Sequence, residues 1–247
     1  MVYNEMKGAY SSVTSLGDRH SKNLLFPDTF YRHDSFGDPS QITKLAFDQF
    51  VSFHGKFYHP TNAIIFVSGI GGGERNRFLD AVNVFLKEFR VDPTVKRDSS
   101  ATWQTKSITT PIRARRPYAS SDRDDKGGRL VLLTWLMNKE PLSRFEEMAI
   151  SILQELLLGK SSSVLKKRLL ESGLGKTVAG YGFEEGLLQQ TFSIGLKDVR
   201  EEDVEKVEDL LMTILGDLAK EDGDGFEEED VAAAINTVEF LVSRVNV

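Results

Sequence analysis

The spacing of apolar residues predicts several amphipathic helices. Residues 41–57 place their aromatic and aliphatic side chains on one helical face, and residues 78–89 repeat apolar residues at intervals of three and four. The same period runs through two long stretches after residue 200, so we predict two closing helices. A more polar helix is predicted for residues 2–24, with an interruption near Gly17.

Other segments have the patterns of strands. Ala63–Val67 and Leu130–Trp135 are short continuous apolar runs, which are typical of strands buried on both faces. Residues 191–196 alternate apolar with small or polar side chains, the period of a strand with one buried face. Residues 177–184 are its predicted hairpin partner.

Periodicity lapses between residues 91 and 128, where Pro, Ser, Thr and alternating charges dominate, so we place a domain boundary near residue 100. The predicted domains are residues 1–100 and 101–247. Beyond the boundary the order is strand, helix, helix, strand, strand, helix, helix; serines 161–163 cap the second of these helices and Gly173 ends it. This order favours an α+β fold with a mixed or antiparallel sheet covered by helices on one side.

Composition excludes several classes of function. The net charge is -6 with both signs interspersed, and the tight basic cluster Arg113, Arg115 and Arg116 is soon followed by aspartates. Nucleic acid is therefore not an expected partner. The chain has no cysteine, so any metal would need His, Asp or Glu ligands. Its apolar runs are far shorter than the roughly 20 residues that span a bilayer, and we expect no membrane partner and no targeting segment in this chain.

Three suggestive motifs fail on spacing. Gly175-Lys-Thr177 lacks the glycine that a phosphate-binding loop needs five residues earlier, and Gly69–Gly73 lacks the last glycine of a dinucleotide fingerprint. Two histidines four apart with a glutamate between them, as a zinc peptidase helix requires, occur nowhere among the four histidines. For His54 and His59 we expect structural or surface roles.

Seven blocks, in order along nearly the whole chain, resemble the presequence protease family. This is the pitrilysin-like group of inverted-motif zinc peptidases, which degrade targeting peptides and other short unstructured peptides in mitochondria and plastids. The blocks are Asn4–Gly8, Leu25–Asp28, Asp34–Pro39, Tyr58–Ala63, Leu169–Gly175, Leu187–Gly195 and Ile235–Phe240.

The resemblance implies a zinc ligand at Glu5, which matches the distal glutamate of the family's metal site. In the family the two histidine ligands and the glutamate base lie several dozen residues upstream, whereas only four residues precede Glu5. Catalytic zinc needs three protein ligands and an open position for water. The resemblance therefore implies a partial chain that is inactive by itself and contains parts of two processing-peptidase-like domains. Residues 1–100 would be the C-terminal part of the first, zinc-site domain. Residues 101–247 would be the major, N-terminal part of the second domain.

The resemblance also suggests a substrate-binding strand. In related peptidases a glycine-bearing strand of the second domain holds the substrate N-terminus by adding it to the sheet edge, and Gly180 and Gly182 match that strand. A pair of turn glycines is the alternative. The implied partners are unstructured peptides and the remaining portion of the parent peptidase, in the mitochondrial matrix or plastid stroma. Two alternatives stay open: a non-catalytic peptide-binding or assembly module, and an incomplete gene model.

Overall fold

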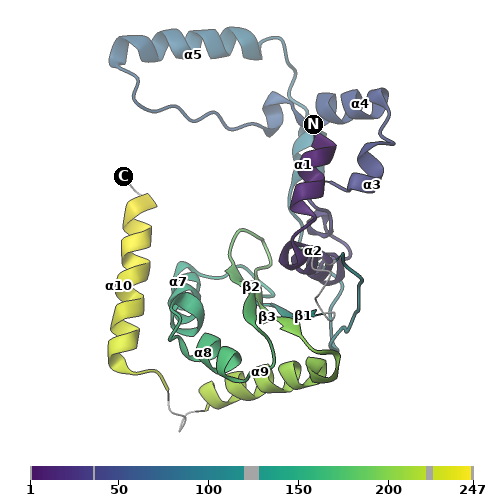
Figure 1. The fold of residues 1–247 in the computed structure, drawn as a ribbon. Helices are drawn as coiled ribbons and strands as arrows, with labels where there is room; N and C mark the ends of the chain where they lie inside the picture. Colours follow the sequence, from purple (N-terminus) through teal and green to yellow (C-terminus); the bar gives the residue numbers. More distant parts are fainter. Residues whose placement is uncertain (1, 36, 120–127, 221–224, 246–247) are drawn as a thin grey trace. The chain divides into compact units, whose positions relative to one another are not determined.

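The structure, a computed structural model, describes residues 2–35, 37–119, 128–220 and 225–245 (Figure 1). The chain divides into two compact units: unit 1 is Met1–Phe36 with Trp103–Val247, and unit 2 is Gly37–Thr102. The division at residue 102 lies close to the boundary expected near residue 100. Residues 1–36, however, belong with the second part of the chain and not with the first, because a helix in this segment lies on the sheet of unit 1.

Unit 2 contains short helices and one longer helix. They are α3 (Pro39–Ile42), α4 (Phe47–Phe57), α5 (Gly72–Leu86) and α6 (Pro93–Ser99), with a 3-10 turn η2 (Pro60–Asn62). Aspartates begin two of them: Asp38 accepts a hydrogen bond from the Ser40 amide at 2.8 Å, and Asp92 accepts one from the Thr94 amide at 2.9 Å. The helix predicted over 41–57 is thus two helices, since α3 ends before α4 begins.

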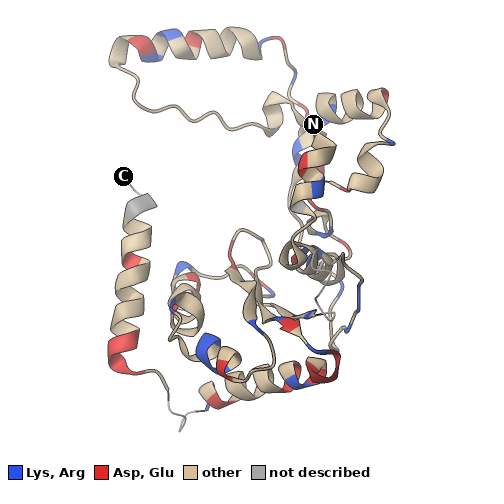
Figure 2. Ribbon diagram, in the orientation of Figure 1, with Lys and Arg blue, Asp and Glu red and all other residues tan. Residues whose placement is uncertain are grey.

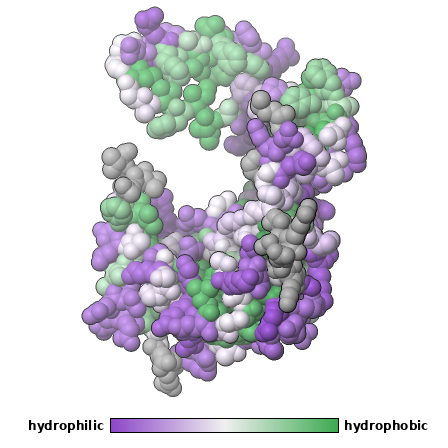
Figure 3. All heavy atoms as spheres, in the orientation of Figure 1, coloured by the Kyte–Doolittle hydropathy of each residue, from purple (hydrophilic) through white to green (hydrophobic). Residues whose placement is uncertain are grey.

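The strand predicted for residues 63–67 is wrong. These residues follow η2 without forming a strand, and Ile64 and Phe66 are 98% and 87% exposed. A strand needs a neighbour for its backbone hydrogen bonds, and among the described residues none is paired with this segment. Figure 3 shows apolar surface over unit 2.

Unit 1 is built on a three-stranded antiparallel sheet in the order β1-β3-β2. Its strands are β1 (Arg129–Leu136), β2 (Thr177–Glu184) and β3 (Thr191–Val199), so both predicted strands after residue 130 and the predicted hairpin are confirmed. Phe192 on β3 lies opposite Phe183 on β2 and Trp135 on β1. These side chains belong to one apolar face of the sheet.

Helices of unit 1 cover this apolar face. They are α7 (Arg144–Gln154), the π-helical turn η3 (Glu155–Gly159), α8 (Val164–Glu171) and α9 (Val204–Leu218). Leu165 and Leu169 of α8 and Leu211 of α9 are fully buried against the strands. Gly173, with φ of +68°, follows α8 and ends it as predicted.

The remaining elements of unit 1 are helices near the two ends of the chain and two short 3-10 turns. They are α1 (Val2–Ala9), α2 (Val13–Leu25), the 3-10 turns η1 (Phe30–Arg32) and η4 (Glu201–Asp203), and α10 (Glu228–Val245). Together with the sheet they confirm the α+β class. Within the described residues we find no helix whose length and apolar content would allow it to cross a membrane.

The opposite face of the sheet is also covered, which corrects the expectation of helices on one side. Gly17 lies inside α2, not at a break, and brings this helix so close to β1 that an added Cβ would be 2.7 Å from Leu130 Cδ2. Thr191 and Ser193 of β3 point to this face and are only 3% exposed. The expectation that β3 is half-buried is therefore wrong, because α2 supplies the second cover.

Candidate functional site

The predicted binding glycines lie on β2, an edge strand of the sheet. Ala179 pairs with Gly195 and Gly182 pairs with Ser193, so one extra residue of β2 forms a bulge between the two pairs. Gly180 has φ of +104° and Gly182 has φ of +65°, a backbone region that favours glycine. The structure thus places both glycines on the edge strand of the sheet.

Each glycine also allows a close approach by a neighbouring group. A Cβ at Gly180 would lie 2.5 Å from the Ser193 carbonyl oxygen, and a Cβ at Gly182 would lie 2.6 Å from Gln154 Oε1. Between them, the amide of Tyr181 donates to Ser193 Oγ at 2.9 Å. The alternative interpretation, in which the pair has a structural role, therefore has its own physical basis, and the two roles are compatible.

The outer edge of β2 is open along part of its length. Thr177 and Tyr181 are exposed, whereas Gly182 and Phe183 are buried. The amide of Phe183 donates to Gln154 Oε1, at the C-terminal end of α7. Of residues 177–181 only Ala179 has a buried side chain, so this stretch is the more accessible part of the edge.

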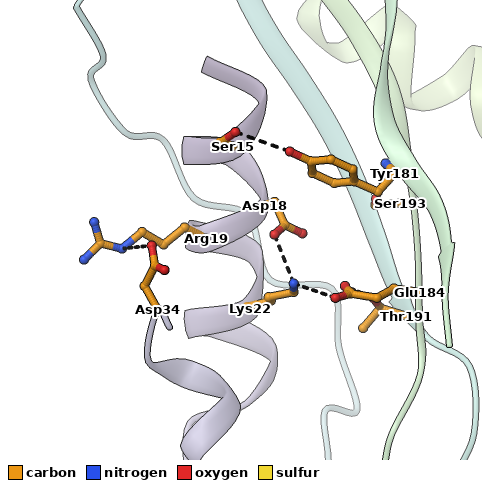
Figure 4. Close-up of polar contacts among 9 residues, drawn as sticks. All are labelled: Ser15, Asp18, Arg19, Lys22, Asp34, Tyr181, Glu184, Thr191 and Ser193. Atoms are coloured by element: carbon orange, nitrogen blue, oxygen red, sulfur yellow. Dashed lines mark hydrogen bonds and ion pairs between the residues drawn. The ribbon is translucent and has the colours of Figure 1, made fainter. Parts of the chain in front are cut away.

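Polar contacts join α2 to β2 beside this edge (Figure 4). Lys22 Nζ donates to Glu184 Oε1 at 2.8 Å and lies 3.1 Å from Asp18 Oδ2, one turn earlier in α2. The hydroxyls of Ser15 and Tyr181 are 3.3 Å apart. Two parts of the chain far apart in sequence are thus held together at the bulge, through Tyr181, and at the C-terminal end of β2, through Glu184.

Charge and burial have opposite effects within this cluster. Burial raises the pKa of Asp18 above its ordinary value, more than the Lys22 ammonium lowers it. For Lys22, burial lowers the pKa, but hydrogen bonds and charge interactions with Glu184 and Asp18 together raise it above its ordinary value. Both carboxylates therefore stabilise the Lys22 cation, with the Glu184 hydrogen bond as the largest favourable effect, while the ionised Asp18 carboxylate costs desolvation energy.

We expect Asp18→Asn to be more stable than the parent chain at pH 7. Because the folded-state pKa of Asp18 is raised, its favourable contribution is present below the unfolded-state pKa of about 3.9 and is lost as the pH rises through the folded-state pKa. The neutral amide avoids this loss. Urea denaturation between pH 4 and pH 8 should show the advantage shrinking at acidic pH. Glu184→Gln is the matched control and should destabilise at pH 7; lower stability of Asp18→Asn at that pH would contradict the assignment.

The proposed zinc ligand stands apart from other metal-binding side chains. Glu5 lies on α1 and is exposed. No group of three or more His, Cys, Asp or Glu residues in the described part of the chain is placed to hold a metal ion. These residues do not fit a zinc centre, which needs at least three protein ligands. The ligand role of Glu5 stays a prediction.

The other charged and aromatic candidates have structural partners. Arg113 donates to Glu208 and Arg115 to Glu201, so two arginines of the basic cluster are paired with carboxylates of the α9 region. Figure 2 shows that acidic and basic residues are interspersed along the ribbon. His59 Nδ1 accepts from the Thr61 amide at 3.2 Å and so caps η2. His54 stacks on Tyr58 with ring centroids 4.5 Å apart.

Sequence reasoning did not find Gln154 or the polar bridge from α2. Gln154 ends an amphipathic helix and nothing in the period of that helix marks it. One signal was present: glycines inside a strand indicate that another group approaches closely. This signal predicts that some group lies close to Gly182, but it does not identify that group as the Gln154 side chain.

Comparisons with known proteins identify the family. Residues 44–238 match the family model of the peptidase M16 inactive domain. The chain is 38% identical to presequence protease 1, chloroplastic/mitochondrial, of Arabidopsis thaliana, over all of this chain and 22% of that protein. It is 32% identical to protein HypA of Clostridium perfringens, over 97% of this chain and 24% of that protein. It is 29% identical to the mitochondrial presequence protease of Drosophila melanogaster, over 100% of this chain and 23% of that protein. The chain thus spans less than a quarter of the length of these relatives.

Solved structures show the same fold at lower sequence identity. A peptidase M16 inactive domain from Pseudomonas fluorescens has a TM-score of 0.59 at 17% identity, covering 96% of this chain and 53% of that one. A protease from Helicobacter pylori has a TM-score of 0.59 at 18% identity, with coverage of 100% and 57%. The family model spans most of the chain, from α4 to α10. The chain therefore belongs to the peptidase M16 inactive-domain family.

Proposed function

We propose that this chain is a peptide-binding, non-catalytic segment of a zinc metalloendopeptidase that degrades targeting peptides and other short unstructured peptides. The observation that carries the proposal is the accessible edge of β2 at residues 177–181, next to a bulge that contains Gly180 and Gly182. Membership of the M16 inactive-domain family and similarity to proteins named presequence proteases support the same function.

Strand addition explains how such an edge would select its ligands. An extended peptide that pairs with β2 gains backbone hydrogen bonds, which do not depend on its sequence, but it must be unfolded to expose them. Folded proteins already use their backbone groups internally. The edge therefore favours unstructured peptides as a class over folded substrates.

Catalysis in this proposal belongs to the remaining portion of the parent peptidase, which is the chain's partner. Glu5 would contribute one zinc ligand to a centre completed by residues of that remaining portion. The compartment we propose is the mitochondrial matrix or plastid stroma, from the names of the eukaryotic relatives.

Backbone-modified peptides test strand addition directly. We expect a fluorescently labelled unstructured peptide to bind the chain, and N-methylation at every second residue in one register to weaken binding at least about tenfold, since each lost hydrogen bond costs about 1 kcal/mol. N-methylation in the other register should have little effect, because those amides face away from β2. Fluorescence anisotropy gives both affinities. Equal effects of the two registers, or no binding at all, would contradict the proposal.

The second candidate is a peptide-binding or assembly module with no role in proteolysis, which the isolated position of Glu5 favours. Mass spectrometry of peptides incubated with the chain, and with the chain joined to the rest of its peptidase, separates the two. Cleavage by the joined protein alone supports the leading proposal. Cleavage by neither, with binding retained, supports the module, and chelator-sensitive cleavage by the isolated chain would refute both.

A further inference from the structure

The side chain of Gln154 occupies one end of the accessible β2 edge. β2 pairs with β3 on one side, and its Phe183 amide donates away from β3, to Gln154 Oε1. This is the position at which the carbonyl of an added strand would accept the same hydrogen bond. The carboxamide of Gln154 thus takes the place of a ligand peptide group.

The residues around the carboxamide leave room for it in this place. Gly182 has no Cβ, and one added there would lie 2.6 Å from Gln154 Oε1 and 3.1 Å from its Cδ. Behind Gln154 the helix continues as the π-turn η3, whose Leu157 is only 5% exposed in the core. Ser163 Oγ donates to the Glu155 carbonyl at 3.2 Å and accepts from the Lys160 amide at 3.0 Å, which closes the turn. π-Turns within helices are frequent at functional sites.

The nitrogen of the same carboxamide retains its hydrogen-bonding capacity. Nε2 of Gln154 has no hydrogen-bond partner among the described residues, although the side chain is half-buried at the end of the edge. An amide nitrogen has two donors, and a carbonyl at the end of an added strand is a matching acceptor. The Gln154 side chain therefore blocks the Phe183 amide through its oxygen and offers a hydrogen-bond donor, through its nitrogen, to the last carbonyl of an added strand.

We propose that Gln154 is a positioning residue that sets where a bound peptide strand ends on β2. It restricts pairing to residues 177–181 by occupying the next hydrogen-bond donor, that of Phe183. The inference rests on the proposed function, because it concerns the same peptide-binding edge. It goes further by assigning the register and the length of the paired segment to one side chain.

A peptide length series tests this limit. For the parent chain, affinity should rise with peptide length and level off once residues 177–181 are paired. In Gln154→Met, which keeps the side-chain length but removes the acceptor, the plateau should come about two residues later, with affinity about fivefold higher for the longer peptides. Gln154→Glu keeps an acceptor oxygen and should retain the parent plateau.

Hydrogen exchange at the Phe183 amide, followed by NMR, gives a readout that is independent of affinity. In the parent chain this amide should be protected with or without peptide. In Gln154→Met it should exchange at least about tenfold faster and regain protection only with long peptides. Circular dichroism verifies that both variants fold. If the Met variant does not fold, the parent chain alone decides the case. A rise in protection of the parent chain's Phe183 amide on binding long peptides would overturn the inference.

The outcomes separate the inference from the proposed function. An unchanged plateau in Gln154→Met, with binding intact in the parent chain, overturns the role of Gln154 and leaves peptide binding standing. Absence of binding by the parent chain to every peptide in the series overturns the proposed function, and the inference with it.

Discussion

Gly195→Ala is expected to separate β1 from β3 and to lower the free energy of unfolding by about 3 kcal/mol or more. Gly195 pairs with Leu132 of β1 and with Ala179 of β2, at the centre of the sheet. An added Cβ would fall on the carbonyl oxygen of Val131, and it would lie 2.9 Å from the Leu132 Cα. These are backbone atoms, so the clash cannot be relieved by a rotamer change and β1 itself must move.

Gly186→Ala is the matched control, because no atom lies within 4 Å of the position of its added Cβ. Urea denaturation followed by circular dichroism should show a large shift of the midpoint for Gly195→Ala and little shift for Gly186→Ala. A near-parental midpoint for Gly195→Ala would show that β1 can move away at little cost in the free energy of unfolding. The close approach of β1 to β3 at Gly195 would then not be needed for stability.

The order of elements after residue 128 could be read from the sequence because its signals are local. The spacing of apolar residues distinguishes the helix α9 from the strand β3, and Gly173 ends α8 at the predicted residue. The β2–β3 hairpin followed from two adjacent segments with strand patterns. Each of these depends on residues close together in the chain, where period and turn chemistry are decisive.

Contacts between distant segments could not be read in this way. Gly17 resembled a helix break but allows α2 to approach Leu130 on the sheet. Ser193, a small polar residue in an alternating strand, was assigned to a solvent face, yet it is buried and accepts a hydrogen bond from Tyr181. Because the sequence does not show that α2 covers the second face of the sheet, the polarity of Ser193 alone predicts an exposed side chain, which is wrong.

The candidate site was only partly predictable, for the same reason. Gly180 and Gly182 came from the family resemblance, and the structure adds their bulge and edge position. Gln154 comes from a separate helix, and its contact with the Phe183 amide depends on how α7 packs against β2. A side chain that acts by reaching across to another element leaves no pattern in its own segment.

We expect this chain to self-associate through its exposed segment Ala63–Val67, and the double substitution Ile64→Lys with Phe66→Lys to weaken that association at least about a hundredfold. Ala63–Val67 combines β-branched and aromatic residues without charge or proline, the composition of an aggregation-prone strand. It is unpaired within the described residues, and Ile64 is 98% exposed. Burial of each large apolar side chain between chains contributes about 1.5–3 kcal/mol, so removing two costs at least about 3 kcal/mol.

Sedimentation velocity over a range of concentrations measures this association, and a second double variant controls for charge. Phe145→Lys with Ile235→Lys adds the same two positive charges at exposed apolar positions, but on helices α7 and α10, most of whose backbone groups are bonded within the helix. If exposed apolar area alone drove association, both double variants would weaken it, in rough proportion to the exposed area that each removes. A selective effect at residues 64 and 66 instead identifies unsatisfied strand pairing as the cause, the same backbone property on which the proposed peptide binding at the edge of β2 depends.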